Sequence, residues 1–261
     1  MSLTTAAGPL ARHPAKSNYR IDSPAHRLFL HPFPRRVRAE LAGETVLDSR
    51  SAFLLYETGL LPRVYVPLQD VRQDVLRATD THSHCPFKGD ASYWSIQVGT
   101  TTADDALWTY LEPKPESAWL RGLVGVYHER LDRWLDEDEE VRPHLRDPFH
   151  RVDARRSTRH VRVLAHGELV AETRRPVVVS ETGLPNRWYV PREDVLAGLQ
   201  PSATVADCPY KGHATYWSLD GVPDACWSYE EPLGEALAAR GHVSFAGDDV
   251  VVEVDGERVA A

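Results

Sequence analysis

The sequence predicts two tandem, mainly β domains of the same fold, built from antiparallel strands with one short helix in each repeat. An internal repeat spans nearly the whole chain, and short β-branched or aromatic runs alternate with turn residues. Only one segment in each repeat has the apolar spacing of a helix. A chain of 261 residues, 42% hydrophobic and 26% charged, is long enough for two ordinary globular domains.

The repeat is visible as a nearly constant shift in residue number between matching motifs. His26-Arg27 matches His150-Arg151, and Cys85 matches Cys208. The shift changes only before the cysteine and after the Tyr-Trp-Ser motif that follows it. Length changes confined to two places indicate surface loops.

The repeat also sets the expected domain boundaries. Residues 1–21 have little apolar periodicity and several breakers, so we expect a poorly ordered N-terminal arm. The first domain is expected over residues 22–145 and the second over 146–261, packed against each other as an intramolecular pseudo-dimer. The five consecutive acids of residues 136–140 are interpreted as the solvated exit from the first domain.

Each repeat is expected to begin with a β-hairpin and to continue with a buried strand. Residues 37–41 and 45–47 alternate weakly around Gly43-Glu44, and the second repeat copies this pattern. The run Val177-Val178-Val179 is β-branched, and residues 52–56 replace it with bulky apolar side chains. A strand buried on both faces permits this exchange. A further short strand in each repeat ends at a proline.

The expected helix of each repeat follows an aspartate. Asp70 precedes Val71, Val75 and Leu76 at helical spacing, and Asp194 precedes a similar pattern, so both aspartates are predicted N-caps. Beyond the cysteine, the aromatic motifs predict a hairpin with a loop of variable length. The end of the second repeat predicts a last hairpin with its turn at the Asp-Gly pair of residues 255–256.

Composition and charge argue against several classes of protein. A net charge of -8 disfavours a broad nucleic-acid surface, and no run has the apolar length of a signal peptide or a bilayer span. Three cysteines form no even disulfide framework, so a reducing compartment, the cytoplasm, is expected. No cofactor and no metal are expected, because each repeat offers one shared cysteine and no glycine-rich phosphate loop.

The stretch Cys208-Pro209-Tyr210-Lys211-Gly212, repeated at residues 85–89, carries the candidate chemistry. A lysine near a thiol favours the reactive thiolate, so Cys208 is a candidate nucleophile with Lys211 beside it. Glu181 is the candidate acid or base. The alternative is a structural cysteine, held extended by the proline that follows it. The sequence shows no histidine base at matching positions next to the two cysteines, and both alternatives stay open.

A binding site for a small molecule fits the inventory of side chains better than catalysis does. Such pockets combine aromatic walls with a few placed polar groups. In the second repeat, Arg187 and Lys211 are predicted to pair with an anionic group, and Tyr189, Tyr216 and Trp217 to form the walls. The matching candidates of the first repeat are Arg63, Tyr65, Cys85, Lys88, Tyr93 and Trp94. Core packing is the alternative use of any one of these rings.

Five short motifs occur in the same order in both repeats: Glu-Thr-Gly, Arg-x-Tyr-Val-Pro, Cys-Pro-Tyr/Phe-Lys-Gly, Tyr-Trp-Ser and Trp-Ser/Thr-Tyr-x-Glu-Pro. This set closely resembles the bacterial domain-of-unknown-function family 427. The resemblance implies a compact, mostly antiparallel domain similar to the β-tent group, which includes methionine sulfoxide reductase B and the ligand-binding domain of cereblon.

The family has also carried a nucleotidyltransferase label, so an enzyme of the transferase or redox type that uses Cys208 stays an alternative to ligand binding. A structural or partner-docking module is a third. The second repeat fits the family pattern better, because the first has Phe87 in place of the usual tyrosine. If one domain has lost activity, we expect it to be the first.

Overall fold

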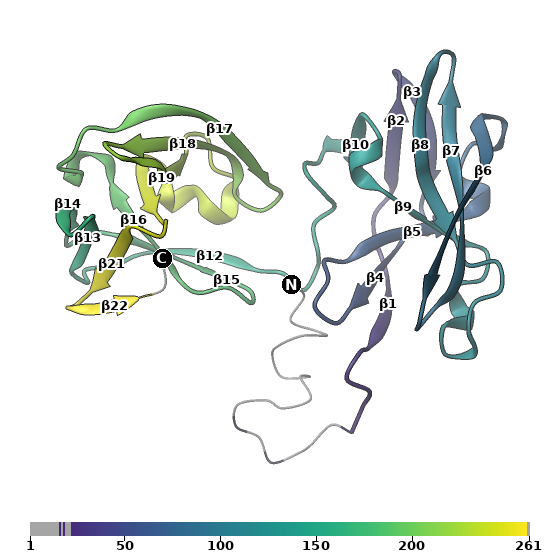
Figure 1. The fold of residues 1–261 in the computed structure, drawn as a ribbon, viewed down its shortest axis with the longest axis horizontal. Coiled ribbons are helices and arrows are strands. Elements are labelled where there is room, and N and C mark those ends of the chain that lie inside the picture. Colours follow the sequence, from purple (N-terminus) through teal and green to yellow (C-terminus); the bar gives the residue numbers. More distant parts are fainter. Residues whose placement is uncertain (1–15, 17, 19–21, 260–261) are drawn as a thin grey trace. The chain divides into compact units, whose positions relative to one another are not determined.

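The computed structural model describes residues 16, 18 and 22–259, and the chain divides into two compact units, Met1–Phe149 and His150–Ala261 (Figure 1). Each unit contains one seven-stranded and one four-stranded antiparallel sheet. The predicted mainly β fold in two similar halves is therefore confirmed. The boundary between residues 145 and 146 and the pseudo-dimer stay predictions. Apart from residues 16 and 18, the expected arm of residues 1–21 lies outside the described residues.

The two repeats follow the same path through their sheets. In spatial order, the large sheet of the first repeat consists of β1 (Leu28–Pro32), β4 (Phe53–Glu57), β5 (Arg63–Pro67), β9 (Leu123–Val126), β8 (Thr101–Thr109), β7 (Gly89–Val98) and β6 (Leu76–Cys85). Its small sheet consists of β11 (Glu139–Glu140), β10 (Arg133–Asp136), β2 (Val37–Leu41) and β3 (Glu44–Ser49).

The second repeat reproduces this order strand by strand. Its large sheet consists of β12 (Val152–Arg156), β15 (Val177–Glu181), β16 (Arg187–Pro191), β20 (His242–Phe245), β19 (Val222–Tyr229), β18 (Gly212–Leu219) and β17 (Gln200–Cys208). Its small sheet consists of β14 (Glu168–Thr173), β13 (Val161–Ala165), β21 (Val250–Val254) and β22 (Glu257–Val259). The predicted last hairpin is β21–β22.

The first predicted hairpin is present in both repeats as β2–β3 and β13–β14. Ala42 and Gly43 both have positive φ (50° and 78°), as do His166 and Gly167 (49° and 84°). Two consecutive left-handed residues form the type I′ turn, whose twist matches that of the flanking strands. In the first repeat the turn therefore lies one residue earlier than the predicted Gly43-Glu44.

The helix predicted after each aspartate is wrong. Asp70 and Asp194 instead end the short 3₁₀ segments η1 (Leu68–Asp70) and η5 (Arg192–Asp194). Their carboxylates accept hydrogen bonds from the hydroxyls of Ser49 and Thr173, each at 2.6 Å. These bonds tie the aspartates to the small sheet, so neither caps a helix.

The valines that follow continue the sheet contacts. Val71 forms an isolated antiparallel bridge with Leu47, and Val195 forms one with Ala171. After Val71 a second 3₁₀ segment, η2 (Gln73–Val75), leads directly into β6. The apolar spacing interpreted as helical therefore arises from burial between two sheets, which β-branched residues suit.

Helical structure among the described residues is limited to 3₁₀ segments, and η4 (His128–Arg130) is another short one. The longest are η3 (Pro115–Leu120) and its counterpart η6 (Gly234–Ala239), each of six residues. Each repeat thus has one short helix of note, but it follows the aromatic hairpin rather than the aspartate. In Figure 1, η6 is the yellow-green coil near β18 and β19.

The two faces of each large sheet have different partners. One face packs against the small sheet and buries a valine-rich core. The other carries a separate cluster of tyrosine and tryptophan side chains, to which residues of η3 or η6 also belong. We call it the aromatic face; in the second repeat it includes Tyr189, Tyr216, Trp227 and Tyr229. This face holds most of the predicted site.

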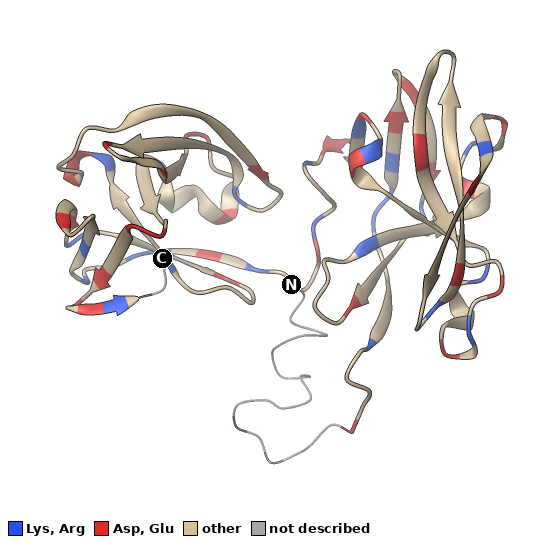
Figure 2. Cartoon of the chain, viewed as in Figure 1, with Lys and Arg blue, Asp and Glu red and all other residues tan. Residues whose placement is uncertain are grey.

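The acidic run of residues 136–140 is a hairpin with basic partners rather than a simple solvated exit. It forms the end of β10, a turn and β11. Arg35 makes a two-bond ion pair with Asp136 at 2.6 and 2.7 Å, and Arg38 bonds to Asp138 at 2.5 Å. Acidic and basic residues are interspersed in this way over both units (Figure 2). At exposed positions such pairs each contribute about 0–1 kcal/mol.

Candidate functional site

The Cys-Pro-Tyr/Phe-Lys-Gly motif is the turn of a β-hairpin in both repeats. Cys208 faces Gly212 across the turn between β17 and β18, and Cys85 faces Gly89 between β6 and β7. Gly212 has a φ of +107°, and a Cβ there would lie 3.2 Å from the backbone oxygen of Glu231. Glycine is therefore required here, because φ is positive and because any side chain would come too close to the backbone of Glu231.

The lysine of the motif forms a desolvated ion pair with the glutamate of the Glu-Thr-Gly motif. The Nζ of Lys211 bonds to the carboxylate of Glu181, and that of Lys88 bonds to Glu57. Lys88 is 6% exposed and Glu57 8% exposed. Because both groups are removed from water, each charged side chain is stabilised mainly by the opposite charge of its partner. The pair links the turn to the end of β4 or β15.

A histidine that the sequence reasoning missed completes this arrangement. The Nε2 of His150 lies 3.0 Å from a carboxylate oxygen of Glu181, and its ring stacks on Tyr210 at 4.3 Å. In the first repeat, His26 lies 3.5 Å from the carboxylate of Glu57 and stacks on Phe87. The repeat alignment paired His26 with His150 but did not place them beside the turn, from which they are far in sequence.

The electrostatics of Glu181 favour an ionised carboxylate. Burial alone raises the pKa of this carboxyl, but the hydrogen bond from His150 and the charge of Lys211 outweigh burial and lower the pKa below its usual value. A group that stays ionised at neutral pH is a poor proton donor. The arrangement suits a carboxylate that orients His150 and balances Lys211.

Tyr189 lies at the centre of the predicted site residues of the second repeat. Its side chain is 1% exposed, and its hydroxyl accepts a hydrogen bond from the Nε1 of Trp227 at 3.0 Å. Burial raises the pKa of this phenol far above the ordinary value, and the nearby Glu181 and Cys208 raise it further, whereas Arg187 opposes them. Glu181, Cys208 and Arg187 therefore lie close enough to Tyr189 to act on the same hydroxyl.

The structure separates Trp217 from the other predicted walls. Tyr216 pairs with Trp227 across β18 and β19, whereas Trp217 pairs with Cys226 and packs against the core between the sheets. The Nε1 of Trp217 donates to Ser228 at 2.9 Å. Adjacent residues of a strand point to opposite faces, so Tyr216 and Trp217 cannot line one pocket. Trp227 takes the place predicted for Trp217.

The first repeat places its candidates in the same way. Tyr65 and Tyr93 belong to its aromatic face with Trp108, whereas Trp94 packs against the core between the sheets. The Nε1 of Trp108 donates to the hydroxyl of Tyr65 at 2.9 Å, the same bond that Trp227 makes to its tyrosine. The framework is therefore common to both repeats.

The arginine on this face has partners in the first repeat that the second lacks. Arg63 lies 3.6 Å from the carboxylate of Glu129, and its guanidinium carbon lies 5.8 Å from the ring centroid of Tyr127. Ala246 stands at the position of Tyr127, since both residues follow matching strands and make matching backbone bonds. The Nη1 of Arg187 is buried and has no hydrogen-bond partner among the described residues.

The tryptophan of the aromatic face also sits differently in the two repeats. In the first repeat, a Cβ on Gly125 would lie 2.3 Å from the ring of Trp108, which is 7% exposed. Ser244 occupies the matching position in the second repeat, and its buried hydroxyl has no partner among the described residues. Trp227 is half-buried there, and the guanidinium carbon of Arg187 lies 5.8 Å from its ring centroid.

A third polar group loses its partner in the second repeat. The hydroxyl of Tyr93 shares a hydrogen bond with Ser83 at 2.8 Å. The matching position of β17 is Ala206, and in the described part of the chain the hydroxyl of Tyr216 makes no hydrogen bond. The second repeat thus presents a guanidinium nitrogen, a serine hydroxyl and a phenol without hydrogen-bond partners among the described residues, around one half-buried indole.

The three cysteines are free, and they should differ in reactivity. Cys226 is fully buried against the small sheet, and burial raises the pKa of its thiol to about 12. We expect iodoacetamide at pH 8 to modify Cys226 in the folded protein at least about a hundredfold more slowly than a free cysteine. Mass spectrometry of each peptide checks this, with urea-unfolded protein as the control. Equal rates at Cys226 in folded and unfolded protein would contradict its burial.

The described residues include no group of three or more His, Cys, Asp or Glu side chains that could hold a metal ion. Within that same part of the chain, no helix has the length and apolar character needed to cross a membrane.

Comparison with known proteins identifies the family. No curated protein is significantly similar to the chain. A family described as a domain of unknown function, DUF427, matches residues 29–137 and again residues 153–259. The two matches correspond to the two units, and together they cover most of the sequence. The chain therefore belongs to the DUF427 family and carries two copies of its domain in tandem.

Proposed function

We propose that the second repeat binds a small anionic ligand with a planar or aromatic body on its aromatic face. In this proposal, the guanidinium of Arg187 pairs with a carboxylate or phosphate of the ligand, and Trp227 and Tyr216 contact the ligand's body. The observation that carries the proposal is the buried Nη1 of Arg187, which has no hydrogen-bond partner among the described residues.

A buried donor without a partner costs about 1–3 kcal/mol, more when the group is charged. An anion that accepts from this nitrogen recovers that cost, and the planar guanidinium favours two-point contact with a carboxylate or phosphate. The unpartnered hydroxyls of Ser244 and Tyr216 would add further hydrogen bonds. The ring of Trp227 offers a surface for stacking.

The proposal gives the two lysines and the first repeat different roles from those expected. The charge of Lys211 is already balanced by Glu181, so Arg187 is the cation that meets the ligand. In the first repeat, the ring of Tyr127 covers the guanidinium of Arg63, and the carboxylate of Glu129 balances its charge. Only the second repeat is therefore expected to bind, although the first has the same framework.

Binding of phenyl phosphate or benzoate tests the proposal. We expect either compound to change the fluorescence of Trp227 saturably, and Arg187→Met to weaken binding by at least about tenfold, because a charge-assisted hydrogen bond contributes about 1.5–3 kcal/mol. Arg63→Met is the matched control and should leave the affinity unchanged. Titration calorimetry gives the affinities. Equal binding by the Arg187→Met and Arg63→Met variants would refute the assignment.

A second candidate is an enzyme of the transferase or redox type that uses Cys208. It is favoured by the His150–Glu181 contact of 3.0 Å beside the cysteine turn, since an oriented histidine is a common base for a thiol. Loss of turnover in Cys208→Ser with intact ligand binding would support this candidate. If substitutions at both Cys208 and Arg187 leave all binding unchanged, a partner-docking module is favoured instead.

The proposed compartment is the cytoplasm. All three cysteines are free thiols, and unpaired cysteines persist most readily where the surroundings are reducing.

A further inference from the structure

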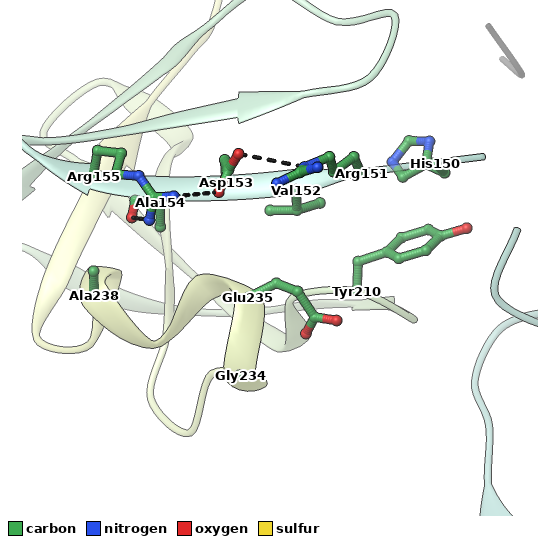
Figure 3. Close-up of a pocket in the computed structure, with 10 residues that line it drawn as sticks. All are labelled: His150, Arg151, Val152, Asp153, Ala154, Arg155, Tyr210, Gly234, Glu235 and Ala238. Carbon is green, nitrogen blue, oxygen red and sulfur yellow. Dashed lines mark hydrogen bonds and ion pairs between the residues drawn. The ribbon is translucent and has the colours of Figure 1, made fainter. Parts of the chain in front are cut away.

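A groove of about 530 Å³ lies in the second repeat between the edge strand β12 and the helix η6 (Figure 3). It is distinct from the set of groups around Arg187. Six consecutive residues, 150–155, line it on one side. Tyr210 and the helix residues Gly234, Glu235 and Ala238 complete the lining. Side chains of consecutive residues point to opposite faces of a strand, so this groove follows the edge of β12 rather than one face.

The backbone of β12 presents hydrogen-bonding groups along this edge that no other strand uses, although the oxygen of Ala154 accepts a long bond of 3.4 Å from Nη1 of Arg155. The oxygen of Arg151 accepts from the nitrogen of Thr182 at 2.9 Å, and the nitrogen of Ser157 donates to the oxygen of Pro176 at 2.8 Å. In an antiparallel ladder, residues bond to the neighbouring strand alternately. The residues that alternate with Arg151 and Ser157, notably Val152 and Ala154, therefore direct their N–H and C=O groups outward.

No other backbone group of the described residues bonds to these outward positions, because β12 is the last strand of its sheet and pairs only with β15. An edge of this kind is a template for another strand.

The side chains of β12 divide the edge into an apolar and a charged side. Val152 and Ala154 are buried on the aromatic face, the same cluster as Tyr210. Asp153 lies on the other side between Arg151 at 3.4 Å and Arg155 at 2.9 Å. Two arginines share one carboxylate, so this side has an excess of positive charge, and both arginines are exposed.

We propose that the edge of β12 binds an extended peptide segment as an additional strand, in which apolar residues alternate with acidic ones. The apolar side chains pack toward Tyr210 and Ala238, and the acidic ones meet Arg151 and Arg155. The backbone of the segment bonds to the outward groups of Val152 and Ala154. Alternation in the peptide matches the two-residue period of the strand.

The first repeat also has an edge strand here, β1, but three of its positions differ. By the same alternation of backbone bonds, Pro32 of β1 is an outward residue, and it has no N–H to donate. Trp119 stands at the position of Ala238, and Phe29 at that of Asp153. We therefore expect the peptide to bind the second repeat in preference to the first, and the first repeat serves as an internal control.

Amide hydrogen exchange of the full chain tests the proposal with a defined probe, the acetylated and amidated hexapeptide Val-Glu-Val-Glu-Val-Glu. In the free protein, the amides of Val152 and Ala154 should exchange faster than those of Asp153 and Arg155. With the peptide at about 1 mM, exchange at Val152 and Ala154 should slow by at least about tenfold. A peptide N-methylated at every residue, which has lost all its backbone donors, should give no protection.

Variants at three places distinguish binding at this edge from binding elsewhere on the chain. Ala238→Trp copies the first repeat and should abolish the protection, while the paired change Arg151→Glu and Arg155→Glu should do so by reversing the charge that meets the acidic side chains. Arg187→Met should leave the protection unchanged, so peptide binding at the edge and anion binding at Arg187 can be refuted independently of each other. Unchanged exchange at 1 mM peptide, or equal protection by the N-methylated peptide, would overturn the proposal.

Discussion

Replacing Glu57 by leucine should destabilise the first repeat by about 3–5 kcal/mol, because the ammonium group of Lys88 would be left buried without its counter-charge. Both side chains are almost fully buried, at 8% and 6% exposure, and Nζ of Lys88 bonds directly to the carboxylate. Nζ of Lys88 also faces the ring of Tyr110, whose centroid lies 5.7 Å away. A cation–π contact at that distance replaces only part of an ion pair.

Urea denaturation at pH 7, followed by exchange of the β5 amides to isolate the first repeat, measures this effect. The double variant Glu57→Leu with Lys88→Met removes both charges and should recover most of the lost stability, since two apolar groups of similar size replace a desolvated pair with little loss. If Glu57→Leu alone costs less than about 1 kcal/mol, the pair behaves as a solvated one, and its burial has no energetic consequence.

The strand plan could be predicted because its determinants are local or repeated. The turn at His166-Gly167 needs two left-handed residues, and the sequence supplies glycine at the second. The duplication added a second copy of every element, so a pattern weak in one repeat was supported by the other. The helix after Asp70 failed because Val71 and Val75 are buried between two sheets, and this burial produces the same spacing as a helix.

The composition of the site was partly predictable, but its geometry was not. The sequence identified Arg187, Glu181 and Lys211 as charged residues at matched positions, and the structure places Arg187 and Glu181 near Tyr189 and pairs Lys211 with Glu181. It could not show that Lys211 is already paired, or that Trp227 rather than Trp217 shares a face with Tyr216. The pairing of Lys211 depends on contact between the turn and the end of β15, and the choice of tryptophan depends on the register of β18 and β19, which is set by pairing across the sheet.

The difference between the repeats was visible in the sequence, but its meaning was not. Three substitutions far apart along the chain distinguish the second repeat from the first. Ala246 replaces Tyr127, Ser244 replaces Gly125, and Ala206 replaces Ser83. Only the folded arrangement shows that all three changes bear on the same aromatic face and leave polar groups there without hydrogen-bond partners. The chemical effect of a substitution depends on the residues that surround it in space, and the order of residues along the chain does not reveal which residues those are.

Acid should destabilise the first repeat through His128, by up to about 5 kcal/mol between pH 6.5 and 3. Burial lowers the pKa of this histidine from 6.5 to about 3, and nearby His144 and Arg63 lower it further. Its Nε2 is buried without a partner, and its ring stacks on Trp134 at 4.5 Å. Between pH 6.5 and 3 the unfolded chain therefore binds a proton that the folded repeat excludes, so stability is complete above pH 6.5 and falls as the pH drops.

His128→Phe keeps a flat ring against Trp134 but cannot take up a proton. The unfolding free energy of the wild-type repeat should fall by up to about 1.4 kcal/mol per pH unit more steeply than that of the variant, which is the slope for one proton. Urea denaturation at pH 6.5, 5.5 and 4.5 measures both slopes. The second repeat has Gly247 at the matching position, so its transition in the same samples should not respond to the substitution. Parallel slopes for wild type and variant in the first repeat would show that His128 takes up its proton as readily in the folded state as in the unfolded chain.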